Sequence, residues 1–199
     1  MRSSNESLEA LLRQSAGLHL HLCPRQVLGV RVGLCGGAAL GLDVPRTDKR
    51  LLVFVETDGC GVDGVSVSTG SRVGRRTLRV LDFGKLAATF VDTHTRQAVR
   101  VVPRAGVRTA ARRYAPSAHN RWMAQLKGYQ QMPEQELLRT QPVTLTIDLE
   151  KLISRPCVRS TCETCGEEII NEREVIQEEV VLCRACAGGS YYQLESATG

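Results

Sequence analysis

The 199-residue sequence contains few aromatic residues and no long apolar segment. Only eight residues are Phe, Trp or Tyr, which limits the stacking of nucleic-acid bases. No apolar run approaches the roughly 18 residues of a membrane helix, and the polar N-terminus, with Glu6 and Glu9, is unlike a signal peptide. These absences argue against a membrane partner and make nucleic acid an unfavoured one, and we expect a cytoplasmic protein.

Charge is divided unequally along the chain. Residues 157–199 contain three arginines and eight acidic residues, net −5, whereas the whole chain carries +5. The rest of the chain therefore carries +10, mostly from arginine. A basic body can bind an anionic partner, but an arginine-rich solvated surface is the commoner explanation. We predict two domains, 1–155 and 156–199, with a joint at Lys151–Pro156.

The first motif that suggests chemistry is Leu18-His19-Leu20-His21-Leu22-Cys23-Pro24. In an extended segment alternate side chains point the same way, so His19, His21 and Cys23 would share one face while the leucines pack inward. Pro24 suits the first position of a helix. Cys23 would then lie at a helix N-terminus, where the dipole favours a thiolate. A partly buried strand edge without any ligand is the alternative interpretation.

A second thiol follows a predicted strand. Leu51–Val55 is a short apolar run, typical of a strand buried on both faces. Cys60 comes next, between two glycines that allow a sharp turn, and helical spacing then continues to Gly70. Because two cysteines that each begin a helix can face each other across one cleft, Cys60 and Cys23 are candidate metal ligands or reactive thiols. A buried structural thiol is the alternative for Cys60 alone.

Charged residues near these thiols complete the candidate site. Glu56 or Asp63, on either side of Cys60, can move a proton beside a metal-bound water. Lys85 follows Gly84 and can aim its ammonium group at a bound anion, although an exposed surface lysine is the ordinary interpretation. The candidate catalytic residues are thus Cys23, Cys60, Asp63 and Lys85.

The C-terminal tail has the spacing of a zinc module. Two C-x2-C pairs are separated by seventeen residues: Cys162 with Cys165, and Cys183 with Cys186. This spacing is typical of a closed, structural four-thiolate zinc site. Segments 168–170 and 179–182 predict a hairpin between the pairs. A segment of about forty residues cannot build an adequate core alone, so the metal supplies its folding free energy. Its acidic character favours protein contact or stabilisation over phosphate binding.

Together these motifs resemble the FmdE family, which is named for the E component of formylmethanofuran dehydrogenase. The resemblance rests on His19–Pro24, Leu28–Gly33, Glu56–Asp63, Thr69-Gly70, Gly74 and Asp82–Lys85. It implies an α+β core, a mixed sheet flanked by helices, with a small C-terminal treble-clef zinc finger. It also implies a core metal or reactive site built from His19, His21, Cys23 and Cys60. Ser71 stands where the family commonly has a further cysteine.

The resulting hypothesis is a metal-binding protein with structural zinc in the finger and a second metal, zinc by its mixed N/S ligands, in the core. The resemblance implies an accessory subunit or enzyme of one-carbon metabolism linked to molybdenum or tungsten redox chemistry. No catalytic redox cofactor motif is present, so enzymatic activity stays open. The alternatives are a thiol–disulfide redox protein using Cys23 and Cys60, or a non-enzymatic binding or regulatory module. We expect protein subunits as partners and a homodimer.

Overall fold

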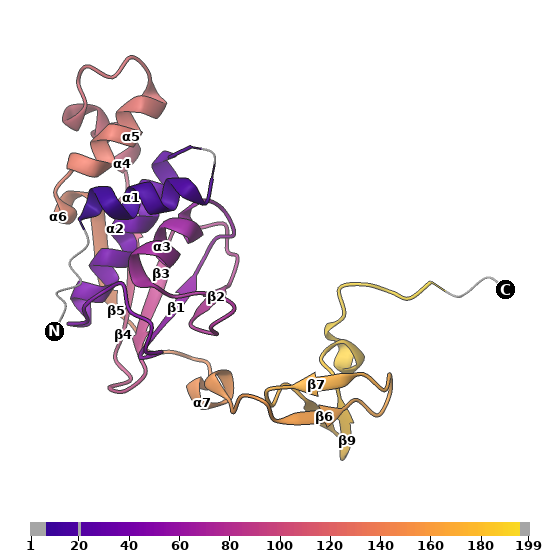
Figure 1. Cartoon of the computed structure of the whole chain (residues 1–199). Coiled ribbons are helices and arrows are strands. Elements are labelled where there is room, and N and C mark those ends of the chain that lie inside the picture. The colour runs from indigo at the N-terminus through magenta and orange to yellow at the C-terminus, as the bar shows by residue number, and fades with distance from the viewer. Residues whose placement is uncertain (1–6, 20, 196–199) are drawn as a thin grey trace. The chain divides into compact units, whose positions relative to one another are not determined.

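The computed structural model describes residues 7–19 and 21–195, and the chain divides into two compact units at Thr144/Leu145. The core unit is drawn in indigo to salmon and the finger unit in orange to yellow (Figure 1). None of the described helices is long and apolar enough to cross a membrane.

The core unit is built on a five-stranded mixed sheet in the order β2-β1-β3-β4-β5. The strands are β1 (Leu51–Val55), β2 (Leu78–Val80), β3 (Ala88–Asp92), β4 (Ala98–Pro103) and β5 (Leu138–Pro142). β1 and β2 are parallel, and every other neighbouring pair is antiparallel. All five residues of β1 are buried, so the central strand predicted from its apolar run is confirmed.

Helices cover this sheet and join its strands. They are α1 (Leu8–Gly17), α2 (Pro24–Ala39), α3 (Gly61–Thr69), α4 (Val107–Ala110), the 3-10 helix η1 (Ala111–Tyr114), α5 (Arg121–Gln131) and α6 (Glu134–Leu137). α2 contacts β3, β4 and β5, while α1 and α3 pack against α2 (Figure 1). A Cβ at Gly36 would lie 2.3 Å from the ring of Phe90, so glycine lets α2 lie directly on β3. The predicted α+β class with a mixed sheet is confirmed.

The last strand of the core begins earlier than its sequence pattern predicts. The pattern places Leu138 in a helical region, yet this residue begins β5 and pairs with Pro103. Leu137 and Leu138 are both buried at the end of α6, and the chain turns directly from helix to strand between them. The alternating apolar residues of Pro142–Leu149 predict a strand or an extended link there. The last core strand instead lies before that segment and ends at Pro142.

The finger unit consists of two small hairpins and short helical segments. These are α7 (Leu149–Ile153), β6 (Arg159–Thr161), β7 (Glu168–Ile170), β8 (Val175–Gln177), β9 (Val180–Leu182) and η2, a short helical segment at Ala185–Gly189. β6 pairs with β7 and β8 with β9, so the hairpin predicted between 168–170 and 179–182 is wrong. Only Glu178 and Glu179 separate β8 from β9, and their left-handed φ values make the tight turn that a hairpin requires.

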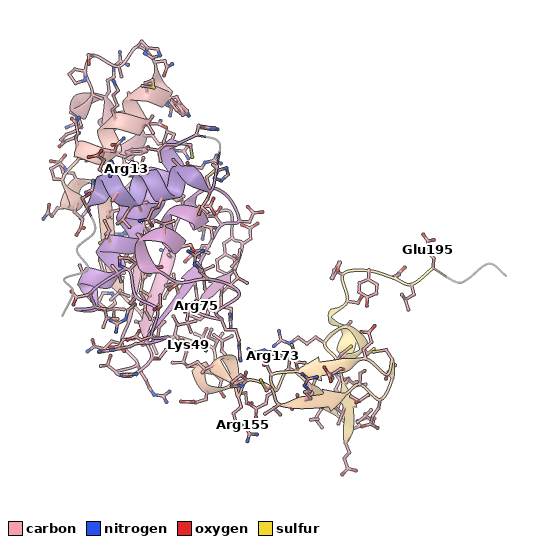
Figure 2. All side chains as sticks on the ribbon, viewed as in Figure 1. Arg13, Lys49, Arg75, Arg155, Arg173 and Glu195 are labelled. Atoms are coloured by element: carbon pink, nitrogen blue, oxygen red, sulfur yellow. The ribbon has the colours of Figure 1, made fainter. Side chains whose placement is uncertain are left out.

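Residues just before the finger are tied to it. Arg173 donates hydrogen bonds to the carbonyls of Lys151 and Leu152, at 2.8 and 2.7 Å. Arg155 forms an ion pair with Glu172. Figure 2 labels Arg155 and Arg173 among the side chains of this unit. These bonds explain why the compact finger unit begins before the Lys151–Pro156 joint that composition predicted.

Candidate functional site

The structure brings the two core thiols together. Cys23 is the N-cap residue of α2 and Cys60 that of α3. Both are half-buried, and the thiol of Cys23 lies close enough to Cys60 to act on its pKa. Burial raises the pKa of the Cys60 thiol, and the contact with Cys23 raises it further. This direction is opposite to the lowering that a helix N-terminus predicts, because desolvation and a neighbouring thiol outweigh the backbone and Arg25.

Glycines in both helices make this meeting possible. A Cβ at Gly29 of α2 would lie 2.2 Å from the carbonyl oxygen of Gly61 in α3. A Cβ at Gly64 would lie 2.3 Å from the carbonyl oxygen of Gln26. Because the opposing atoms are backbone, no side-chain rotation relieves such a contact. The two helices therefore approach closely at their first turns, where the thiols lie.

Gln26 fixes the start of α2. Its Oε1 accepts a hydrogen bond from the backbone N–H of Cys23 at 2.8 Å, and its Nε2 donates to the carbonyl of Ser15 at 2.7 Å. Gln26 is completely buried, so α2 is anchored to α1 through this one side chain. Sequence reasoning missed this contact, although a glutamine three residues after an N-cap is a capping-box signal.

The segment before Cys23 is not the predicted strand. The backbone N–H groups of Leu18 and His19 donate to the carbonyls of Ser15 and Ala16, which turns the chain at the end of α1. Leu18 is 53% exposed, so its predicted inward packing is wrong. Leu22 does pack against the core, and Leu20 lies outside the described residues.

The two histidines lie differently from each other. His19 is exposed, and its Nε2 lies 2.7 Å from Oδ2 of Asp63, in the first turn of α3. Asp63 thus links the segment before α2 to the helix that begins at Cys60. His21 is exposed in the same segment. His19 is therefore not placed by alternation along a strand. Its contact with Asp63 holds it against α3, whose N-cap residue is Cys60.

Glu56 and Lys85 occupy one corner of the core. Arg100 of β4 donates to both carboxylate oxygens of Glu56, at 2.6 and 2.7 Å, and Glu56 is buried at the end of β1. The backbone N–H of Lys85 donates to the carbonyl of Glu56, while its side chain is exposed. Both carboxylate oxygens of Glu56 are thus held by a guanidinium group, which leaves Asp63 as the more accessible acid.

A cleft of about 530 Å³ begins at Arg25 in the first turn of α2, and sequence reasoning missed most of its lining. Lys85 is the one lining residue among the site residues predicted from the sequence. The other charged lining residues are Arg25, Arg100, Arg104, Arg108 and Arg121. Arg100, Arg104 and Arg108 follow one another at intervals of four residues, whereas Arg25 and Arg121 come from distant segments of the chain.

The tail cysteines form a compact thiolate cluster. The ligand atoms of Cys162, Cys165, Cys183 and Cys186 all lie within 4.8 Å of one another. Across residues 7–19 and 21–195, no other group of three or more metal-ligating side chains is so compact. The Sγ atoms of Cys165 and Cys183 are 3.9 Å apart, close to the roughly 3.8 Å between sulfurs in a tetrahedron with Zn–S bonds of about 2.3 Å. The four residues therefore fit zinc.

The electrostatic interactions among the four thiols also favour a bound cation. Backbone N–H groups, first that of Cys165 and then that of Cys183, lower the pKa of Cys162 to about 6. Hydrogen bonding to Cys183 and burial raise the pKa of Cys186 to about 12. Four adjacent sulfurs cannot all ionise without compensation, because each thiolate opposes the next. A divalent metal removes that conflict and deprotonates its coordinating thiols.

Comparisons with known proteins agree with this organisation. The family model FmdE, described as "Molybdenum formylmethanofuran dehydrogenase operon", matches residues 18–154. The model of the prokaryotic dksA/traR C4-type zinc finger matches residues 158–192.

Two relatives extend the comparison. A "Probable S-adenosyl-L-methionine-binding protein" of Archaeoglobus fulgidus is 29% identical over 93% of this chain, which spans about half (54%) of that protein's length. A crystal structure of a "tungsten formylmethanofuran dehydrogenase subunit e (fmde)-like protein" from Syntrophus aciditrophicus has a TM-score of 0.61 at 20% identity. The match covers 96% of this chain and 98% of that one. The chain belongs to the FmdE family and carries a C4-type zinc finger at its C-terminal end.

Proposed function

We propose that this metal-binding protein holds a second metal in its core, in addition to the structural zinc of the finger. The ligands would be Cys23, Cys60 and one or both of His19 and His21. The observation that carries this proposal is the meeting of two half-buried thiols at the first turns of two closely packed helices. A mixed nitrogen and sulfur set suits zinc.

The contact between His19 and Asp63 supports a ligand role for the histidine. Metal-ligating histidines ordinarily donate their other ring N–H to a carboxylate, which sets the tautomer and the orientation of the ring. Oδ2 of Asp63 lies 2.7 Å from Nε2 of His19 and would accept a hydrogen bond from it. Nδ1 is then the ring nitrogen whose lone pair would bind a metal.

A zinc ion with three protein ligands would supply Lewis acidity and a bound water of lowered pKa. Asp63 is the residue placed to hold and move a proton, because its carboxylate is partly exposed and contacts His19. Glu56 serves a different purpose: its pairing with Arg100 ties the end of β1 to β4, close to the turn that carries Cys60.

We further propose a role in one-carbon metabolism, as an accessory protein or enzyme linked to molybdenum- or tungsten-dependent redox chemistry. The description of the FmdE family model, which names a molybdenum formylmethanofuran dehydrogenase operon, supports this assignment. The chain's own residues would contribute metal-centred polar chemistry, with electron transfer left to another protein.

Metal analysis of anaerobically purified protein tests the core site. We expect two zinc ions per wild-type chain, one in Cys23→Ala, and two in the control Cys157→Ala, which removes an exposed cysteine outside both sites. Cys162→Ser should instead lose the finger metal and keep the other. Equal metal content in wild type and Cys23→Ala would defeat the proposal.

A thiol–disulfide cycle is the second candidate, favoured by the nearness of Cys23 and Cys60 at the N-caps of two packed helices. In exchange with a disulfide of a partner protein, the two thiols would lose two protons and two electrons to form one S–S bond, and the partner would gain two thiols. Mass spectrometry of metal-free protein after mild oxidation should then find a Cys23–Cys60 bridge. Finding both cysteines unbridged would count against this cycle.

A further inference from the structure

The basic cleft that begins at Arg25 is not used by either proposed chemistry. It runs from Arg25 and Lys85, next to the start of α3, to Tyr129 on α5. Leu86 forms part of its wall, and a Cβ at Gly61 would lie 2.4 Å from the Cδ1 of Leu86. The cleft therefore opens immediately beside the residue that follows Cys60. Its volume of about 530 Å³ is within the range of small-molecule sites.

The cleft is lined by six cationic side chains and, among the described residues, by no acidic one. Two of the six are already engaged: Arg100 with Glu56, and Arg104 with the carbonyl of Leu138. The other four, within the part of the chain that the structure describes, make no ion pair or side-chain hydrogen bond; they are Arg25, Lys85, Arg108 and Arg121. Like charges held around one cavity repel each other, so an anion bound between them would be stabilised.

Tyr129 provides an independent indication of a ligand. Its side chain lines the cleft and is only 1% exposed, yet its hydroxyl has no hydrogen-bond partner within residues 7–19 and 21–195. Buried hydroxyls are nearly always satisfied, and an unsatisfied one destabilises the fold. Burial raises the pKa of this hydroxyl, and the charges of Arg108 and Arg121, which also line the cleft, oppose that rise.

The backbone around Tyr129 is firmly held, so the unsatisfied hydroxyl is not the result of a loose helix. Arg31 of α2 donates to the carbonyl of Tyr129 at 2.8 Å and to that of Met132 at 3.0 Å. Gly128 allows the close approach of α5 to η1, because a Cβ there would lie 2.4 Å from the carbonyl oxygen of Ala111. The tyrosine is therefore fixed in position in the wall of the cleft.

We propose that this cleft binds a small organic phosphate, held by the unpaired cations and the Tyr129 hydroxyl. Arginine forks match the geometry of phosphate oxygens and bind them in pairs. Apolar wall residues would contact the organic part of the ligand; they are Leu28, Leu86, Val102 and Val107. A phosphate ester bound here would contact Leu86, which packs against Gly61, the residue after Cys60. The proposal concerns ligand binding and holds whether or not the thiols bind metal.

Calorimetric titration of the full chain with 1-naphthyl phosphate tests the proposal. We expect saturable binding at one site, tighter than binding of inorganic phosphate and absent for uncharged 1-naphthol. The variant Arg108→Gln/Arg121→Gln should bind at least tenfold more weakly, since each lost charge-assisted contact accounts for about tenfold in affinity. The control Arg72→Gln/Arg75→Gln removes the same charge from exposed residues that do not line the cleft, and it should bind as wild type does.

Each other outcome overturns the proposal. Equal weakening by both double variants would indicate non-specific attraction to a basic surface, as would salt-sensitive binding of arbitrary DNA in place of the ester. Equal affinity for 1-naphthoate would indicate a carboxylate site. If the ester shows no saturable binding, the cleft is not a site for an organic phosphate.

The Tyr129→Phe variant distinguishes an effect on ligand binding from an effect on the stability of the fold. Removing an unsatisfied buried hydroxyl should leave the thermal midpoint unchanged or raised. If the hydroxyl donates to the phosphate, the same variant should bind 1-naphthyl phosphate several-fold more weakly. A folded variant with wild-type affinity would exclude the tyrosine from the proposed site.

Discussion

Gly64→Ala should force α2 and α3 apart and separate the core thiols. The added methyl group would lie 2.3 Å from the carbonyl oxygen of Gln26 and 2.6 Å from the backbone nitrogen of Val30. Ordinary contacts begin at 3.4 Å, so the helices must separate by about 1 Å to accommodate it. Neither opposing atom belongs to a side chain that can rotate away.

The expected loss of stability follows from two opposing effects. Overpacking costs about 1–3 kcal/mol, and the upper end applies because backbone must move. Alanine offsets about 1 kcal/mol of this through its better helix propensity. We therefore expect the free energy of unfolding to fall by about 2 kcal/mol. Urea unfolding followed by the fluorescence of Trp122 measures it, because this single tryptophan lies in α5 of the core unit.

A second readout connects this packing to the site. Oxidative bridging of Cys23 to Cys60 in metal-free protein should become slower in Gly64→Ala. The control Gly74→Ala has no atom within 4 Å of its added Cβ and should behave as wild type. An unchanged urea midpoint together with an unchanged bridging rate would refute the claim that glycine contacts bring the thiols together.

Two further predictions concern an ion pair and the finger. Arg50 forks onto Asp92, whose side chain is 2% exposed, and holds the pKa of that carboxyl well below its usual range. This stabilisation is present above about pH 4 and is lost as the pH falls further. The Asp92→Asn variant should therefore have a free energy of unfolding about 3 kcal/mol lower at neutral pH. Its urea midpoint should also fall less steeply as the pH is lowered. Chelation of zinc should unfold β6–β9, seen as loss of strand signal in circular dichroism, while Trp122 emission stays native; a simultaneous loss of both signals would contradict it.

Local patterns predicted the elements that depend on neighbouring residues. The apolar run of β1, the glycine-flanked turn at Cys60 and the paired tail cysteines each carry their signal within a few positions. The left-handed Gly70 that ends α3 belongs to the same class. In each case one short segment contains both the constraint and the residues that satisfy it.

Patterns failed where a distant partner decides the outcome. The alternating His19 segment suggested a strand, but hydrogen bonds back to α1 turn it, and Asp63 of another helix captures the imidazole. Leu138 joins a strand because β4 offers an edge to it. The basic cleft collects Arg25, Lys85 and Arg121 from segments far apart in sequence, and no periodicity relates them.

Every strand of the five-stranded sheet is complete before Thr144, since β5 ends at Pro142. The finger contributes no strand to that sheet. In evolutionary terms, recombination between the codons for Thr144 and Leu149 can add, delete or exchange the C-terminal module while the core sheet keeps all of its backbone pairing. Such a boundary lets one core domain be combined with different C-terminal modules.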